Sequence, residues 1–87
     1  MTSKIKIVIL QRGWIYVGRF SKLEEGMCQL EGAQCIRRWG TTKGLGELVN
    51  GPLASTKLDP VGIVQFHNLT MVASIDVKDE KWAKICD

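Results

Sequence analysis

The sequence predicts a mainly β protein: a small, antiparallel, partly open barrel with one short helix and a short helical tail. Short segments rich in β-branched and aromatic residues follow one another along the chain, and glycine-bearing turns separate them. One stretch, residues 44–50, has apolar residues at helical spacing. The chain has 87 residues, of which 45% are hydrophobic and 24% charged, so we expect a single domain over residues 1–87 with a packed core.

The first two strands are expected at residues 4–10 and 14–20, as a hairpin around a turn at residues 11–13. The first strand begins with lysines alternating with isoleucines, the pattern of a half-buried strand. The second has apolar groups on both faces, with Trp14 and Tyr16 on one and Ile15 on the other. Because a chain this short has little material to cover both faces, this strand predicts self-association.

Two more short strands are expected at residues 27–30 and 34–39, separated by a turn at Glu31–Gly32. The short helix at residues 44–50 follows the fourth strand and ends at Asn50-Gly51-Pro52, because proline cannot continue it. The rest of the chain is predicted as a turn at residues 59–62, a hairpin of strands at 63–66 and 71–77, and a helical tail from Asp79 that Trp82 and Ile85 attach to the barrel.

Small domains often need a disulfide, a metal or a partner subunit for stability. The three cysteines are an odd number and follow no secretory segment, so we expect free thiols and a cytoplasmic location. One histidine and no paired cysteine motif give no reason to expect a metal or another cofactor. By elimination we expect a homo-oligomer. No apolar run approaches the roughly 20 residues of a membrane span, so no membrane partner is expected.

The net charge of +3 is unevenly distributed along the chain. Residues 1–57 hold nine Lys and Arg against four Glu, whereas residues 58–87 hold three Lys against five Asp and Glu. A basic excess of this size favours an anionic partner, either a small molecule or a nucleic acid.

Two resemblances add to this interpretation. The run Ile36-Arg-Arg-Trp-Gly-Thr-Thr-Lys-Gly-Leu-Gly-Glu-Leu48, with Asn50-Gly51-Pro52 after it, resembles a family of short uncharacterised proteins of phages and integron-type gene cassettes. Val17-Gly18 and the closing segment 61–75 are similar to the two halves of an Sm-like barrel, a relative of the SH3-like barrels. The second resemblance implies a bent five-stranded sheet that forms rings. Cys28 and Phe66-His67 stand where Sm proteins have base-clamping residues, so most of that RNA-binding set is absent.

The candidate binding site is the segment from Arg37 to Glu47. Successive side chains of a strand face opposite ways, so one of the two arginines is expected to face apolar company, paired with Glu31 or Glu47. The alternative role for an arginine here is to bind a carboxylate or phosphate beside an indole that can stack on a ring. The residues assigned to the site are Arg37, Arg38, Trp39, Thr41, Thr42, Lys43, Gly44 and Glu47.

The glycine-rich loop of this segment is open to two interpretations. Its N–H groups, hydroxyls and ammonium group would suit an anion, although it is not a Walker A motif. Alternatively it is a turn capped by Thr41 or Thr42. A lone His67 and isolated cysteines provide no catalytic set, so we expect no enzyme. The predicted function is non-catalytic recognition of an anionic or aromatic partner by an oligomeric module of mobile-element origin. The alternatives are an Sm-like ring that binds single-stranded RNA, and a small enzyme.

Overall fold

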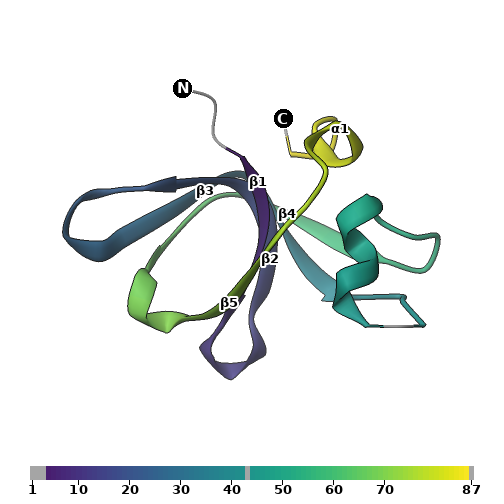
Figure 1. Cartoon of the computed structure of the whole chain (residues 1–87), viewed down its shortest axis with the longest axis horizontal. Helices are drawn as coiled ribbons and strands as arrows, with labels where there is room; N and C mark the ends of the chain where they lie inside the picture. Colours follow the sequence, from purple (N-terminus) through teal and green to yellow (C-terminus); the bar gives the residue numbers. More distant parts are fainter. Residues whose placement is uncertain (1–3, 43, 87) are drawn as a thin grey trace.

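The structure, a computed structural model that describes residues 4–42 and 44–86, is a single bent antiparallel sheet (Figure 1). The strand order across the sheet is β4-β3-β2-β1-β5, so β4 and β5 are its two edges. The strands are β1 (Ile5–Leu10), β2 (Ile15–Lys22), β3 (Met27–Arg38), β4 (Lys57–His67) and β5 (Met71–Asp76). The helical segments are the 3-10 turns η1 (Gln11–Gly13), η2 (Glu24–Gly26), η3 (Leu45–Asn50) and η4 (Asn68–Thr70), and the α-helix α1 (Asp79–Trp82).

The sheet curls far enough for non-adjacent strands to share a core. Val8 on β1 and Phe66 on β4 belong to the same buried cluster, although β2 and β3 lie between their strands. The Phe66 ring also lies 6.4 Å from the ring of Phe20 on β2, centroid to centroid. A flat sheet would keep these side chains apart, so the predicted partly open barrel is confirmed.

A second core lies on the other face of the sheet, where η3 and α1 cover it. Leu48 from η3 and Trp82 from α1 are fully buried there, next to Ile7 and Val17 of the strands. The indole Nε1 of Trp82 donates a hydrogen bond to the Leu48 carbonyl oxygen at 2.8 Å. A short helix and a tail attached by Trp82 are therefore present as predicted, but the helix is of the 3-10 type and follows the third strand, because the predicted third and fourth strands are both part of β3.

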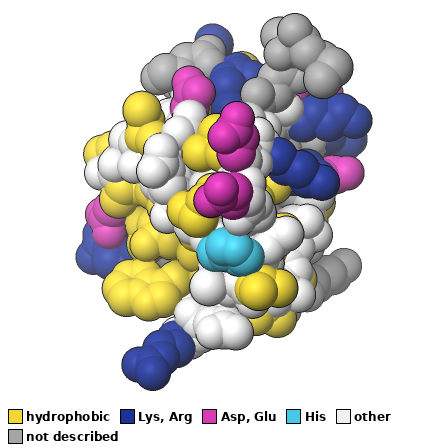
Figure 2. Space-filling view, turned by 90° about the vertical axis from the view of Figure 1, so that its left-hand side faces the viewer, with side chains coloured by type: hydrophobic (Ala, Val, Ile, Leu, Met, Phe, Trp, Pro, Cys, Tyr) yellow, Lys and Arg dark blue, Asp and Glu magenta, His cyan; other side chains and the backbone are white. Residues whose placement is uncertain are grey.

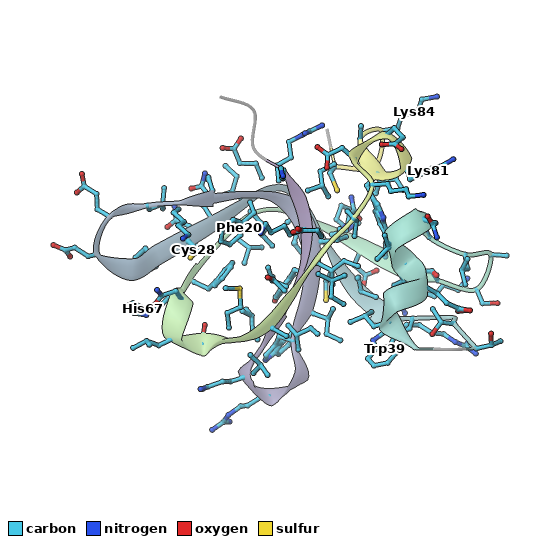
Figure 3. All side chains as sticks on the ribbon, viewed as in Figure 1. Phe20, Cys28, Trp39, His67, Lys81 and Lys84 are labelled. Atoms are coloured by element: carbon cyan, nitrogen blue, oxygen red, sulfur yellow. The ribbon has the colours of Figure 1, made fainter. Side chains whose placement is uncertain are left out.

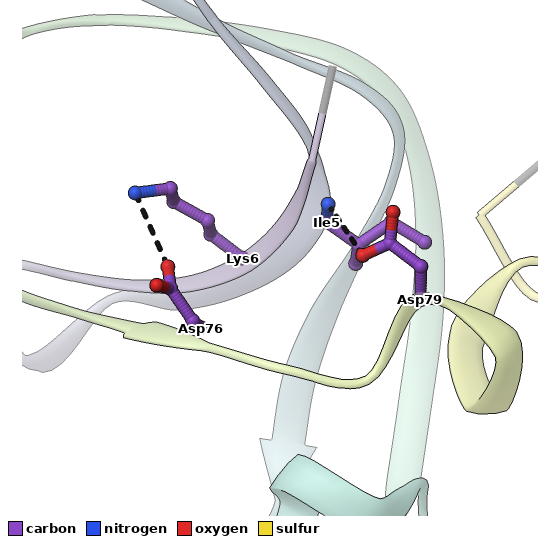
Figure 4. A network of polar contacts seen from close by, with 4 residues as sticks. All are labelled: Ile5, Lys6, Asp76 and Asp79. Carbon is purple, nitrogen blue, oxygen red and sulfur yellow. Dashed lines mark hydrogen bonds and ion pairs between the residues drawn. The ribbon is translucent and has the colours of Figure 1, made fainter. Parts of the chain in front are cut away.

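Polar contacts fasten β1 to the C-terminal segment (Figure 4). The backbone N–H of Ile5, at the start of β1, donates to the Asp79 carboxylate at 3.2 Å. Lys6 forms an ion pair with Asp76 of β5 at 3.2 Å, between residues that are cross-strand partners. β1 is therefore tied both to the last residue of β5 and to the first residue of α1.

Two predicted turns are wrong, because both lie within long strands. The predicted turn at Glu31–Gly32 lies inside β3, which is continuous from Met27 to Arg38. Gly32 has a φ of +59°, and a β-carbon there would collide with the backbone of Cys86, so glycine allows both the bend and the approach of the tail. The turn predicted at residues 59–62 is part of β4. Proline is accepted in an edge strand where its missing N–H faces outward, and Pro60 lies in such a strand.

The second strand does not need a partner subunit to cover both of its faces. Ile15 and Val17 are buried in the core beneath η3 and α1, whereas Tyr16 and Phe20 pack on the core inside the curl. The argument for self-association from this strand is therefore wrong, because the bend of the sheet supplies cover on both sides. In the described residues, no helix is long and apolar enough to cross a membrane.

Candidate nucleic-acid interface

The predicted site begins where β3 leaves the core. Ile36 is the last buried residue of this strand, and the register with β4 is irregular between Ile36 and Arg38. Arg37 and Arg38 are consequently both exposed, and the expectation that one of them faces apolar company is wrong. Arg37 Nε lies 2.9 Å from Asp59 Oδ2, across the β3–β4 pair. The partner is thus Asp59 rather than a glutamate.

Arg38 lies directly opposite a second cation. Its cross-strand partner is Lys57, the first residue of β4, and both residues are exposed. Within residues 4–42 and 44–86, neither side chain forms an ion pair. Like charges opposite each other destabilise a strand pair. The structure thus leaves two uncompensated positive charges side by side at this end of the sheet.

Trp39 follows Arg38 on a backbone that is held from the other side of the loop. Its carbonyl oxygen accepts a hydrogen bond from Thr56 Oγ1 at 2.6 Å, and the same hydroxyl accepts one from the Leu53 N–H at 3.0 Å. Gly40, with a φ of +65°, lies so close to the Ser55 backbone that no side chain would fit. Trp39 remains 42% exposed. Figure 3 marks its place, well away from His67.

The glycine-rich loop is closed by a carboxylate of its own chain. The N–H and the hydroxyl of Thr42 donate to the two carboxylate oxygens of Glu47, at 3.0 and 3.2 Å. Glu47 therefore holds the turn before η3. The N-cap residue of η3 is Gly44, which has no side chain, so neither Thr41 nor Thr42 is at the N-cap. Thr41 is partly buried, and Lys43 lies outside the described residues. An anion-binding role for this loop stays a prediction.

The opposite end of the molecule brings η2 and η4 together. His67 lies over Gly26, where an added β-carbon would be 2.8 Å from the imidazole Nε2, and His67 Nδ1 accepts the Leu69 N–H at 3.1 Å. Cys28 is buried opposite Phe66 in the β3–β4 pair. Figure 3 shows His67 and Cys28 well away from Trp39. In Figure 2 the histidine lies near the middle of this face, with acidic side chains above it and apolar ones around it.

These residues offer no poised chemical group. In the part of the chain that the structure describes, no cluster of three or more His, Cys, Asp or Glu side chains is placed to hold a metal ion. Burial raises the pKa of the Cys35 thiol above its ordinary value of 9.0; nearby Asp59 adds to the shift and Arg37 opposes it. The thiol is therefore protonated at neutral pH, unlike a catalytic cysteine.

Apolar side chains on the two sheet edges are a feature that the sequence-based site did not include. Ile63 on β4 is 64% exposed and Val72 on β5 is 68% exposed. Lys57 and Asp59, which complete the surroundings of the two arginines, were also missed. The sequence signal for Lys57 and Asp59 is the alternation of polar and apolar residues over residues 57–59. This start of β4 was not recognised, because a turn was predicted at residues 59–62.

Comparison with known proteins is informative at the level of fold. No protein-family model matches the sequence, and no curated protein matches it. Among solved structures, a heptameric archaeal Sm protein superposes with a TM-score of 0.58 over 88% of this chain and 90% of its own, at 15% sequence identity. This chain has an Sm-like fold. That resemblance in the sequence is confirmed for the architecture, whereas the resemblance to gene-cassette proteins stays a prediction.

Proposed function

We propose that this chain is a non-catalytic subunit of a homo-oligomeric ring that binds single-stranded RNA. The observation that carries the proposal is the pair of unpaired edges, β4 and β5, at the two ends of an Sm-like sheet. The solved Sm protein that it resembles is heptameric and was discussed for its implications for the eukaryotic snRNP core. RNA is both anionic and aromatic, so the proposal is a specific form of the partner predicted from the sequence. A mobile-element origin is proposed with it, on the sequence resemblance alone.

The edges provide a physical reason to assemble. An edge strand exposes a row of unpaired N–H and C=O groups, and natural proteins usually protect it with charges or cover it. Here Ile63 and Val72 are largely exposed on β4 and β5, where charged residues would be expected in a monomer. If β4 of one copy pairs with β5 of the next, the contact is heterologous, and such contacts close into a ring when the rotation fits.

Pro60 limits where this pairing can occur. It has no N–H to donate to an incoming strand, so the first part of β4 is a poor edge for extension. The rest of the strand, from Val61 to His67, has no proline and includes the exposed Ile63. We therefore place the subunit contact on residues 61–67, with β5 of the neighbouring copy.

Support for RNA comes from the charge of the chain. The first 57 residues hold nine Lys and Arg against four Glu, and phosphate contacts by such residues supply most nucleic-acid affinity. In a ring, each subunit would present its basic surface to the same RNA strand. Binding through several subunits raises the overall affinity without any new kind of contact.

The test is the assembly state and RNA binding of an edge variant. Ile63→Glu places a charge in the proposed contact, so light scattering should show a mass near the 9.7 kDa of one chain, whereas the unmodified protein should be a multiple of it. Leu23→Glu is the matched control, because Leu23 is also exposed but lies between β2 and η2, outside both edges and away from Trp39. Binding of a short single-stranded RNA should fall with Ile63→Glu only. An unmodified protein that is monomeric at micromolar concentration, or that binds no RNA, would contradict the proposal.

A further inference from the structure

We infer that Arg38, Lys57 and Trp39 form a site for one nucleotide of a single-stranded RNA, with the two cations on a phosphate and the indole stacked on an adjacent base. The inference deepens the proposed function and rests on it, since it names the surface that meets the strand. It places this surface at the end of the sheet where β3 finishes at Arg38 and β4 begins at Lys57, which we call the β3–β4 end. His67 and Cys28 lie at the other end of the same two strands (Figure 3).

The two cations are the first argument. Arg38 and Lys57 are directly opposite each other in the β3–β4 ladder, and such partners have β-carbons about 4.5–5.5 Å apart. One phosphate group can therefore contact both side chains. Because the like charges repel in the free protein, an anion between them removes a repulsion as well as adding attraction.

The neighbouring Arg37 is not part of the site, because a carboxylate already compensates its charge. Arg37 is already compensated by Asp59 at 2.9 Å, so its guanidinium is less available to a ligand. No described carboxylate forms an ion pair with Arg38 or Lys57. A guanidinium binds phosphate through two parallel N–H donors, and the ammonium adds a point charge.

Trp39 is the second argument, because it is exposed on a braced backbone. The Thr56 hydroxyl holds its carbonyl oxygen at 2.6 Å, and Gly40 is in contact with the Ser55 backbone. Of the other two tryptophans, Trp82 is fully buried and Trp14 already stacks on Tyr16, with ring centroids 6.5 Å apart. An exposed aromatic on a fixed backbone is a stacking platform for a base, and less order has to be gained on binding.

Access is the third argument. Lys57 lies before Pro60 on β4, in the part of the strand that is a poor edge for another copy. Assembly through residues 61–67 therefore leaves the site open to an RNA strand. Each subunit of the ring would contribute one such site.

The experiment measures fluorescence anisotropy of a short fluorescein-labelled single-stranded RNA over a range of salt concentrations. Arg38→Ala and Lys57→Ala should each lower the slope of log affinity against log salt by about 0.7, the value for one phosphate contact on a single strand. Trp39→Ala should weaken binding about 5- to 100-fold with little change of slope, and Trp39→Phe should restore most of it. Lys84→Ala is the charge-matched control, because Lys84 is exposed on the C-terminal tail, away from Trp39 (Figure 3).

The outcomes separate the site from the proposed function. All variants should keep the oligomer mass, since the three side chains are exposed, and none should melt below the unmodified protein, because Arg38→Ala and Lys57→Ala each remove a repulsion. RNA binding that none of the three substitutions weakens would overturn the site and leave the proposed function standing, as would equal losses with Lys84→Ala. Tighter binding of a single-stranded DNA of the same sequence would overturn the assignment to RNA. A stable oligomer of the unmodified chain that binds no RNA would overturn the proposed function itself.

Discussion

Trp82 donates its indole N–H to the carbonyl oxygen of Leu48 at 2.8 Å, and both side chains are fully buried. This contact joins the helical tail to η3, and the Lys78 N–H joins the same two segments by donating to the Val49 carbonyl oxygen at 3.0 Å. Because Glu47 of η3 accepts hydrogen bonds from Thr42 in the preceding loop, the tail supports that loop, next to the candidate site, through η3. The tail is thus part of the scaffold of the β3–β4 end.

Trp82→Ala should lower the free energy of unfolding by about 3–5 kcal/mol, the usual cost of removing a large buried aromatic. Trp82→Phe keeps most of the packing and removes one of two hydrogen bonds to the Leu48 carbonyl oxygen, which still accepts from the Gly51 N–H at 3.1 Å, so a smaller loss of about 0.5–1.5 kcal/mol is expected. Trp14→Phe is the control, since Trp14 is 57% exposed and should change stability by less than about 0.5 kcal/mol. Urea unfolding followed by circular dichroism measures all three. Equal effects of the Trp82 and Trp14 changes would contradict the structure.

Gly32→Ala should be more destabilising than Gly62→Ala, although both glycines have a positive φ. The strain of a β-carbon in this conformation is about 1–2 kcal/mol at either position. At Gly62 the added atom meets nothing within 4 Å, whereas at Gly32 it meets the Cys86 backbone and must displace the tail. Gly32→Ala should therefore also shift tryptophan emission to the red as Trp82 becomes exposed. Equal stability losses, with unchanged emission, would show that the tail does not pack against β3.

The sequence predicted the parts of the fold that depend on local patterns. The alternating lysines and isoleucines of β1 and the helical spacing of Leu45 and Leu48 are local signals, and both elements are present. The long strands β3 and β4 were not predicted, because Gly32 and Pro60 look like turn residues. Gly32 instead makes room for Cys86, a contact between distant parts of the chain, and Pro60 is allowed by its place at a sheet edge.

The candidate site was predicted in part for the same reason. The adjacent cations and Trp39 could be recognised from sequence, but their partners depend on the register between β3 and β4. That register places Asp59 beside Arg37 and Lys57 opposite Arg38, and no local pattern specifies it. Successive side chains were expected on opposite faces of one sheet, yet both arginines are exposed because the strand has passed the core at Ile36.

Stability should fall at alkaline pH because of Cys35 and Tyr16, which are cross-strand partners. Burial raises the pKa of the Cys35 thiol above 9.0, and burial together with the Cys35 thiolate raises the pKa of Tyr16 above 10.0. The folded state thus holds these protons more tightly than the unfolded state. Their contribution is fully present below the unfolded pKa values, and it is lost as the pH rises through the folded ones.

The measurement is urea unfolding at several pH values between about 7 and 11. The decrease in the free energy of unfolding above about pH 9 should be smaller in Cys35→Ala, which removes one titrating group and its effect on Tyr16. Gln29→Ala is the control, because it changes another partly buried residue of β3 that carries no ionisable group. A stability that rises between these pH values as a result of Cys35 would contradict the sign of the shift.

Arg37→Ala tests whether the ion pair with Asp59 lies on the surface, as the structure shows. The side chains are 66% and 47% exposed, so the substitution should cost less than about 1 kcal/mol. A buried pair broken in this way would cost about 3–5 kcal/mol.

Because Arg37 opposes the upward shift of the Cys35 pKa and Asp59 adds to it, Arg37→Ala should raise that pKa further, and Asp59→Asn should lower it. Alkylation of Cys35 by iodoacetamide, followed by peptide mass spectrometry across a pH series, reports the midpoint for each variant. Arg38→Ala is the control and should leave the midpoint unchanged; shifts in the same direction for Arg37→Ala and Asp59→Asn would refute the placement of the pair beside this thiol.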